Sequence, residues 1–308
     1  MDNLKKTDFN TKVLGAVSIM RAVFEPTPLQ KNEHLSKKYK ANIFLKREDL
    51  SPVRSYKLRG ALNSMQKCSD IKHFVCASAG NHAQGVAYMA SHLNVRATIF
   101  MPSTTPLQKI SKTKIFGGDN VETRTVGDYF DECLSAATEF SQKEKAHFLS
   151  PFDDSDVIEG QGTVAAEIES QLGFVPDKIV MPVGGGGLSA GVISFFGENC
   201  EYFLTEPAGA ASLTAALAAG RPTKLDTIDN FTDGASVAKV GSLNYEILKN
   251  ISLSDVLLVP ENRICVTMLE MLDIEGIVLE PAGALSVDAL KDIPHQIENK
   301  NIVCITTG

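Results

Sequence analysis

The sequence predicts an α/β protein whose sheets are rich in parallel strands and carry helices on both faces. Three observations support this fold class. Strand-like apolar runs alternate with helix-like segments along most of the 308 residues, as in strands joined by crossover helices. Two glycine-bearing turns, at 78–80 and 184–187, each end an apolar run and open a helical segment. The length exceeds that of one simple core and suits two domains.

Each element is assigned from the spacing of its apolar residues. Short apolar runs are predicted as strands, and they cover residues 43–45, 74–77, 97–101, 121–125, 178–182, 202–204, 256–259 and 302–305. Segments with apolar residues at helical spacing are predicted as helices, and they cover residues 82–93, 106–116, 129–140 and 164–172. The chain ends at Gly308, soon after the last strand, so we expect the sequence to be truncated there.

The strand–helix–strand–helix block from about residue 74 to residue 148 is compact in sequence and interrupts the other elements. We therefore predict a small inserted domain, residues 61–148, within a larger cofactor-binding domain built from residues 1–60 and 149–308. No internal repeat or low-complexity segment in the sequence changes this division.

Composition excludes several classes of function. A formal charge of −7 argues against a nucleic-acid-binding surface, because phosphate backbones select basic faces. The six cysteines include no C-x-x-C pair and lie mostly in apolar runs, so we expect buried thiols and neither disulfides nor a metal site. No apolar stretch reaches about 18 residues, and the N-terminal segment leads into no apolar signal region. We therefore expect a cytoplasmic protein with no membrane partner.

Lys57 is the first candidate for chemistry, within the motif S-Y-K-L-R-G-A at residues 55–61. It follows a short strand and stands at the start of a predicted helix. A lysine alone in this position is most often a solvated helix start. Together with the turns at 78–80 and 184–187, however, it provides an amine nucleophile beside two helix N-termini that can bind anions. Pyridoxal phosphate chemistry requires this set, because the turns can hold the cofactor phosphate and a substrate carboxylate.

The run of four glycines at 184–187 is the stronger of the two turns. Glycines allow backbone N–H groups to face an anion without a Cβ in the way, and the following helix adds its dipole. A second interpretation stays open, because residues 185–190 match the dinucleotide fingerprint G-x-G-x-x-A. Glu206 ends the next strand, about 20 residues on, where a ribose-binding acid is expected. A dehydrogenase has no need of Lys57 or Asn81, which favours pyridoxal phosphate.

The turn S-A-G-N at residues 78–81 is the second anion site that the sequence predicts. One interpretation is that Asn81 is simply the N-cap of the following helix, which is the commonest role of asparagine at a helix start. The small residues before Asn81 allow the backbone N–H groups of the turn to approach a carboxylate, which favours a substrate-binding turn. His82 follows directly, and with no carboxylate near it in sequence, a helix-start role is favoured over that of a catalytic base.

Other charged residues receive structural interpretations first. We expect a solvated helix face for Lys109, Lys112 and Lys114. Three acids follow apolar runs and precede proline or glycine, which places them near strand ends where sites of α/β proteins form. These weaker candidates are Glu206, Asp233 and Glu280.

Together the motifs resemble the threonine dehydratase (threonine ammonia-lyase) family of fold type II pyridoxal phosphate enzymes, whose fold is similar to that of the tryptophan synthase β chain. The resemblance covers nearly the whole chain. It rests on the motifs T-P-L (27–29), L-K-R-E-D-L (45–50), S-Y-K-L-R-G-A (55–61), S-A-G-N-H-A-Q-G (78–85), E-G-Q-G-T (159–163), G-G-G-G-L (184–188), D-G (233–234) and E-P-A-G-A (280–284). Each motif alone is weak or moderate, whereas their conjunction in this order is specific.

The resemblance implies roles for particular residues. Lys57 resembles the catalytic lysine that forms the Schiff base, and Asn81 resembles the residue that hydrogen-bonds the 3-oxygen of the cofactor. Thr307 stands where the family usually places a serine that faces the pyridine nitrogen. The residues implied to bind the substrate are Ser78, Ala79, Gly80, Asn81 and His82. Those implied to bind the cofactor phosphate are Gly184, Gly185, Gly186, Gly187 and Leu188.

Three departures from the family pattern bear on the site. Tyr56 replaces the usual phenylalanine and adds a hydroxyl that needs water or a partner. Glu159 replaces a small residue in what we expect to be a loop, residues 159–162. Biosynthetic members carry a C-terminal regulatory domain that binds isoleucine, and we expect it to be absent from this chain, although residues 231–237 resemble the biosynthetic branch.

The resemblance implies a cytoplasmic lyase of isoleucine biosynthesis that converts L-threonine to 2-oxobutanoate and ammonia, and L-serine to pyruvate, as a homodimer or homotetramer. Alternatives are a serine racemase or hydroxyaspartate dehydratase of the same fold, an NAD-dependent dehydrogenase, and a protein that only carries pyridoxal phosphate. Racemases of this fold resemble S-S-G-N at the first turn, with a serine as second acid–base group. Ala79 stands at that place and cannot transfer a proton, which favours elimination.

Overall fold

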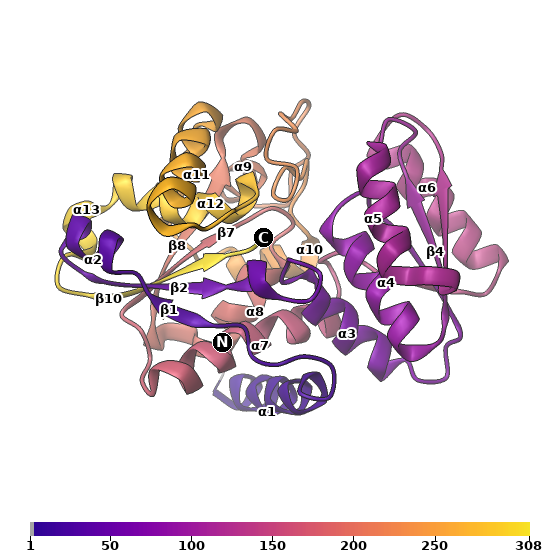
Figure 1. Ribbon diagram of the computed structural model, residues 1–308, viewed down its shortest axis with the longest axis horizontal. Helices are drawn as coiled ribbons and strands as arrows, with labels where there is room; N and C mark the ends of the chain where they lie inside the picture. Colours follow the sequence, from indigo (N-terminus) through magenta and orange to yellow (C-terminus); the bar gives the residue numbers. More distant parts are fainter. Residues whose placement is uncertain (1–2) are drawn as a thin grey trace.

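The computed structural model describes residues 3–308 and contains two sheets, each covered by helices on both faces (Figure 1). The larger sheet has six strands, in the order β1 (Leu29–Lys31), β2 (Asn42–Arg47), β10 (Asn301–Thr306), β7 (Lys178–Pro182), β8 (Glu201–Pro207) and β9 (Val256–Val259). Neighbouring strands are parallel except for β1 and β2. The smaller sheet has four parallel strands, in the order β5 (Val121–Thr125), β4 (Arg96–Met101), β3 (His73–Ala77) and β6 (His147–Phe148).

The helices divide between the two sheets. Around the larger sheet lie α1 (Asn3–Met20), α2 (Glu33–Tyr39), α7 (Ser155–Leu172), α8 (Gly187–Phe196), α9 (Ser212–Ala219), α10 (Ser242–Leu248), α11 (Glu261–Glu275), α12 (Pro281–Asp288) and α13 (Pro294–Ile297). The smaller sheet is covered by α4 (Asn81–Leu93), α5 (Leu107–Gly117) and α6 (Phe130–Lys143). Between the two bodies lies α3 (Lys57–Lys67), which packs against both α7 and α4 (Figure 1).

Alternating side chains of the central strands fill two separate cores. In β10, Val303 and Ile305 belong to the core under α1, α7 and α8, whereas Ile302 and Cys304 belong to the core under α11 and α12. Successive side chains of a strand point to opposite faces, so a strand covered by helices on both sides is apolar throughout. This explains why the parallel strands are visible in the sequence as continuous apolar runs.

The predicted fold class is confirmed, and each predicted strand lies within a strand of the structure. The strands β1 and β6 and the helices α1, α2 and α9 to α13 were not predicted. All six cysteines are free thiols, and only Cys265 is exposed. Within residues 3–308, every helix is too short or too polar to cross a bilayer.

One expectation was wrong: residues 159–162 are not a loop but lie inside α7. This helix begins after Asp154, whose carboxylate accepts hydrogen bonds from the backbone of Asp156 and Val157. The glycines in it serve close packing. A Cβ on Gly160 would lie 2.6 Å from the backbone oxygen of Arg59, so α7 can approach α3 at this distance only without a side chain there.

A buried ionic cluster fixes α3 to the larger body. The Arg59 guanidinium donates to both oxygens of Glu48, at 2.8 Å each, and to both oxygens of Glu167, at 2.9 and 2.7 Å. Lys46 adds a second cation at 2.7 Å from Glu167. Since Arg59 lies two residues after Lys57, this cluster holds the start of α3, where the candidate nucleophile stands, against β2 and α7.

Candidate active site

The candidate site lies between the two bodies, at the carboxyl ends of strands from both sheets. The turn after β3 opens α4, the glycine loop after β7 opens α8, and the segment after β2 leads to α3. The end of β10 lies beside them, because the backbone N–H of Tyr56 donates to the Thr307 carbonyl at 3.3 Å. Parallel strands place their carboxyl ends at one edge of a sheet, where α/β proteins form their sites.

Lys57 is a half-buried amine at the first residue of α3. Its Nζ donates to the Pro151 carbonyl at 2.9 Å and lies 5.4 Å from the ring centre of Tyr56 and 5.8 Å from that of Phe152. Within residues 3–308 it forms no ion pair. Burial lowers its pKa to about 8, and the nearby charge of Glu280 opposes that shift only in part. The amine is therefore partly neutral near pH 8.

The glycine loop is a backbone surface held close to Phe152. A Cβ on Gly185 would lie 2.2 Å from the Phe152 ring, and one on Gly187 would lie 3.1 Å from the Phe152 carbonyl. Gly186 has a φ of +91°, which L side chains rarely adopt. The loop is held from behind by Asn244, whose side chain donates to the Gly185 carbonyl at 2.7 Å. Only glycines fit this loop, and it ends on the N-terminus of α8.

The turn before α4 is open on one side and tied to α12 on the other. Nothing lies within 4 Å of the position that a Cβ on Gly80 would take. Ser78 fixes the turn, because its hydroxyl accepts from the backbone N–H of Gly80 at 3.2 Å. The Asn81 side chain donates to Glu280, the residue before α12, at 2.8 Å. The turn thus presents its backbone to open space while Asn81 reaches across to the larger body.

Thr307 directly follows β10 and is buried, and its hydroxyl is unsatisfied. Its side-chain oxygen is buried, and it has no hydrogen-bond partner. Other buried hydroxyls also lack a partner, but this one lies next to Tyr56 at the site, where it is free to bond a group that the protein itself does not supply.

His82 keeps the structural role that the sequence favoured, whereas Lys109 does not. His82 is buried and donates to the Leu149 carbonyl at 3.2 Å, and burial lowers its pKa to about 3, so it is neutral. Lys109 is not simply a solvated residue, because it forms an ion pair with Asp233 across the two bodies.

Glu206 does not face the site, so it was wrong as a candidate. Its carboxylate accepts hydrogen bonds from the backbone N–H groups of Leu213 and Thr214, at 2.6 and 2.9 Å. These are donors at the first turn of α9, where a carboxylate is stabilising. A ribose-binding acid would need free oxygens, so this packing removes one support of the dinucleotide interpretation.

Two residues of the site carried no local signal in the sequence. Pro151 contributes only its carbonyl, and Phe152 contributes a ring between Lys57 and the glycine loop. They lie in the connection from β6 to α7, where a proline followed by an aromatic residue has many structural roles. Only the folded chain shows that this connection forms one wall of the site.

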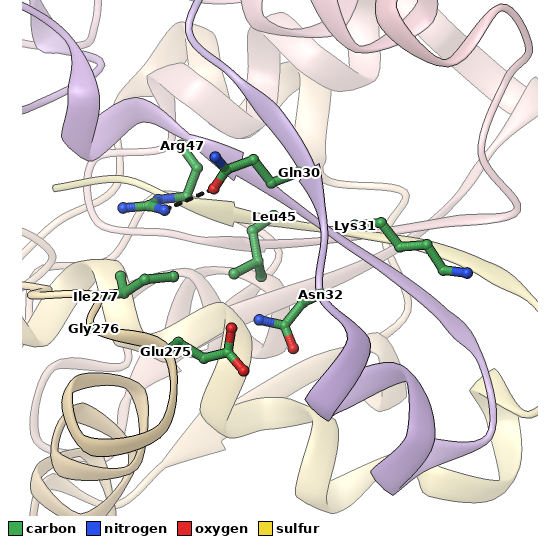
Figure 2. Close-up of a pocket in the computed structure, with 8 residues that line it drawn as sticks. All are labelled: Gln30, Lys31, Asn32, Leu45, Arg47, Glu275, Gly276 and Ile277. Atoms are coloured by element: carbon green, nitrogen blue, oxygen red, sulfur yellow. Dashed lines mark hydrogen bonds between the residues drawn. The ribbon is translucent and has the colours of Figure 1, made fainter.

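The cavity drawn in Figure 2 is a different place. It has a volume of about 590 Å³ and is lined by β1, β2 and the end of α11. Its buried cation, Arg47, is already bonded to Asp49 and Gln30. None of the candidate site residues lines it. Within residues 3–308, no group of three or more His, Cys, Asp or Glu residues is arranged to hold a metal ion.

This chain belongs to the pyridoxal-phosphate dependent enzyme family, whose pattern matches residues 21–308. The biosynthetic L-threonine dehydratase of Lactococcus lactis subsp. lactis is 50% identical over 306 residues, which are 96% of this chain and 73% of that protein. The biosynthetic L-threonine dehydratase of Bacillus subtilis is 45% identical over 302 residues, which are 96% of this chain and 71% of that protein. The processed form of threonine deaminase isoform 2 from Solanum lycopersicum has a similar structure, with a TM-score of 0.91 and 37% identity, covering 100% of this chain and 90% of that one.

Pyridoxal phosphate is therefore the cofactor of this protein, and the dinucleotide alternative is not favoured. The residues of the site fit this group. Lys57 is a half-buried amine without an ion pair, and the loop at 184–187 offers backbone N–H groups where any side chain would collide. The orphaned Thr307 hydroxyl can donate to a ring nitrogen.

Proposed function

We propose that this protein catalyses the dehydration and deamination of L-threonine to 2-oxobutanoate and ammonia, and of L-serine to pyruvate, as a step of isoleucine biosynthesis. The observation that carries the proposal is Lys57, an amine with a lowered pKa between a glycine loop and an open turn. The identity with biosynthetic L-threonine dehydratases over 96% of the chain supports the choice of substrate.

Each group of residues has a proposed role. Lys57 binds the cofactor covalently, and the backbone of residues 184–188 holds its phosphate at the N-terminus of α8. Asn81 donates to the 3-oxygen of the cofactor and Thr307 donates to its pyridine nitrogen. The turn from Ser78 to Gly80, with the backbone of Asn81 and His82, binds the substrate carboxylate.

When bound, pyridoxal phosphate supplies an electron sink for the pair left at Cα as the proton is removed. Lys57 is the base that takes this proton. At pH 7.5 a lysine with the ordinary pKa of 10.5 is neutral in about one molecule in a thousand, whereas a pKa of about 8 raises that fraction to about a quarter. Burial thus increases the amount of active base by about two orders of magnitude. Ala79 provides no second acid or base beside the substrate, so elimination is expected without racemisation.

The remaining assignments concern the whole molecule. We propose a homodimer or homotetramer in the cytoplasm, with residues 61–148 as a small inserted domain and residues 1–60 and 149–308 as the larger one. The separate small sheet supports this division, although the boundary after residue 60 falls inside α3.

The test combines spectroscopy with product analysis. Purified protein loaded with pyridoxal phosphate is expected to be yellow, to lose its colour with borohydride, and to carry the reduced cofactor on Lys57 in peptide mapping. Incubation with L-threonine should release 2-oxobutanoate and ammonia in equal amounts. A yellow protein that forms neither product would contradict the proposed reaction, and a label on another lysine would contradict the role of Lys57.

A further inference from the structure

Glu280 is a half-buried acid at the site to which the proposed reaction gives no role. It is the residue before α12, and its Oε1 accepts a hydrogen bond from Asn81 Nδ2 at 2.8 Å. Asn81 opens α4, so this bond joins the larger body to the smaller one at the site. Within residues 3–308, Glu280 forms no ion pair. Partial burial without a paired cation disfavours the ionised form of this acid, which calls for a specific reason.

Two glycines leave space for the Glu280 carboxylate, because a side chain at either position would collide with it. A Cβ on Gly308 would lie 2.5 Å from Oε1, and a Cβ on Gly234 would lie 3.0 Å from it. The backbone N–H of Glu280 donates to the Gly308 carbonyl at 3.0 Å, which fixes the residue next to Thr307. The carboxylate therefore occupies a fixed place between the end of β10, the loop at Gly234 and Asn81.

Several charged groups act on Glu280. Burial raises its pKa to about 7, and the carboxylate of Asp233 adds to this shift. The hydrogen bond from Asn81 and the charges of Lys109 and Lys112 on α5 oppose it. The charge of Glu280 in turn raises the pKa of Lys57 on α3. The carboxyl group thus titrates near neutral pH, and its charge affects the pKa of the nucleophile, Lys57.

The chemistry of an amide explains what the bond to Glu280 does. An asparagine side chain has a donor end and an acceptor end of the same shape, and a neutral environment distinguishes them poorly. An ionised carboxylate only accepts, so it selects the orientation in which the Asn81 NH2 group faces Glu280. One N–H is then used by Glu280, and the second N–H of the same group stays available. A protonated Glu280 can donate to the amide oxygen and removes this selection.

We infer that Glu280 is a positioning residue: its carboxylate fixes the Asn81 amide so that the second N–H is presented to the 3-oxygen of the cofactor. Asn81 is the residue that touches the cofactor, and Glu280 acts through it. This inference rests on the proposed role of Asn81 in pyridoxal phosphate binding. It also assigns a function to the E-P-A-G-A motif at residues 280–284.

A double-mutant cycle on the holoenzyme tests the inference. The variants are Asn81→Ala, Glu280→Ala and the two combined, with Glu246→Gln on α10 as a control for the loss of an exposed carboxylate. The readouts are the visible band of the bound cofactor, the dissociation constant of pyridoxal phosphate, and turnover of L-threonine. Each single variant is expected to shift the band and to weaken cofactor binding by about tenfold, the effect of one hydrogen bond to a charged group. The double variant should be no worse than Asn81→Ala alone, because Glu280 acts through Asn81.

A pH titration of the visible band provides a second test that keeps Glu280 in place. The wild-type band should change near pH 7, and Glu280→Gln should abolish this change. Asp233→Asn should move it to lower pH, because one repulsive charge is removed and Lys109 loses its partner.

The inference fails if the losses in the double variant multiply, or if Glu280→Gln leaves both the band and its titration unchanged. These outcomes are distinct from failure of the proposed function, which would appear as a wild-type protein that forms no 2-oxobutanoate. Glu246→Gln should leave every readout at its wild-type value, and an equal shift in that control would also overturn the inference.

Discussion

At the scale of single residues, the site depends on one amine and on the absence of side chains around it. Lys57 is held in an environment that disfavours its charge, since its Nζ has a carbonyl and two aromatic rings as neighbours and no carboxylate in contact. The glycines provide backbone donors at distances that any Cβ would prevent. Changes to these two features should have separable effects, one on chemistry and one on cofactor binding.

Lys57→Ala should leave a folded protein that binds pyridoxal phosphate without a covalent link. Turnover should fall by several orders of magnitude, because both the covalent attachment and the base are lost. The measurement is residual absorbance and mass after borohydride treatment, together with 2-oxobutanoate formation. Lys143→Ala, at an exposed position of α6, is the control and should behave as wild type. Activity of Lys57→Ala within tenfold of the control would contradict the role of Lys57.

Gly185→Ala should weaken cofactor binding by at least about tenfold without unfolding the protein, because the new Cβ would lie 2.2 Å from the Phe152 ring and must displace it or the loop. Titration of the cofactor-free protein with pyridoxal phosphate measures this loss. The matched control is Gly15→Ala in the middle of α1, where nothing lies within 4 Å. That control should stabilise the helix by about 0.5–1 kcal/mol and leave cofactor affinity unchanged. Equal affinities for the two variants would show that the loop does not hold the phosphate.

At the scale of elements, the position of α3 depends on buried charges and not on apolar packing alone. Arg59 is enclosed by Glu48 and Glu167, and the two cations Arg59 and Lys46 hold the pKa of Glu167 well below its ordinary value of 4.5. Each charge is stable there only because the others are present. Removing one of them leaves its partners buried and unpaired.

Glu167→Gln should therefore destabilise the protein by about 3–5 kcal/mol, the cost of breaking a buried ion pair from one side. Because the folded pKa is depressed, the ionised carboxylate stabilises the wild type above about pH 4.5, and this contribution is lost as pH falls through the folded pKa. The variant should show a weaker loss of stability with acid over that range. Urea unfolding at pH 7, and at several pH values from 4.5 down to about 2, measures both effects. Glu169→Gln, exposed on the same helix, is the control, and an equal change in both variants would contradict the argument.

The sequence predicted the elements well where the signal is local. The parallel strands are apolar on both faces, so residues such as Ile179 and Val303 mark them directly. The glycine turns were visible because their composition is unusual. The start of α7 was missed because Gly160 is a poor helix former, and its reason for being there is contact with Arg59, about a hundred residues earlier in the chain.

At the scale of the whole molecule, the site could be predicted only in part, because its members come from distant segments. The bond between Asn81 and Glu280 joins residues 199 positions apart, and no local pattern in the sequence specifies it. The last strand, β10, lies between β2 and β7, which brings Thr307 beside Tyr56. Lys57 and the turns were found because each carries its chemistry in a short motif, whereas Phe152 and the pairing of Glu280 depend on the packing of the two bodies.

The two bodies share one hydrophobic core, which has a consequence for their unfolding. Met20 of α1, Leu62 of α3 and Cys76 of β3 belong to the same buried cluster, so the smaller sheet packs on helices that also cover the larger one. Unfolding the smaller body alone would expose apolar surface on both bodies, and each Å² exposed would cost about 25 cal/mol of free energy. We therefore expect a single cooperative transition, although the chain forms two sheets.

Thiol labelling during urea unfolding tests this expectation with probes that the protein already carries. Cys76 is buried in the core of the smaller sheet and Cys304 in that of the larger sheet, whereas Cys265 is exposed. Peptide mass spectrometry after brief labelling should show Cys76 and Cys304 becoming reactive at the same urea concentration, which should match the transition seen by circular dichroism. Cys265 should react without urea and so reports that the reagent is active. Labelling of Cys76 at clearly lower urea than Cys304 would show that residues 61–148 unfold independently, because the contacts of α3 with α7 would then outlast those with α4.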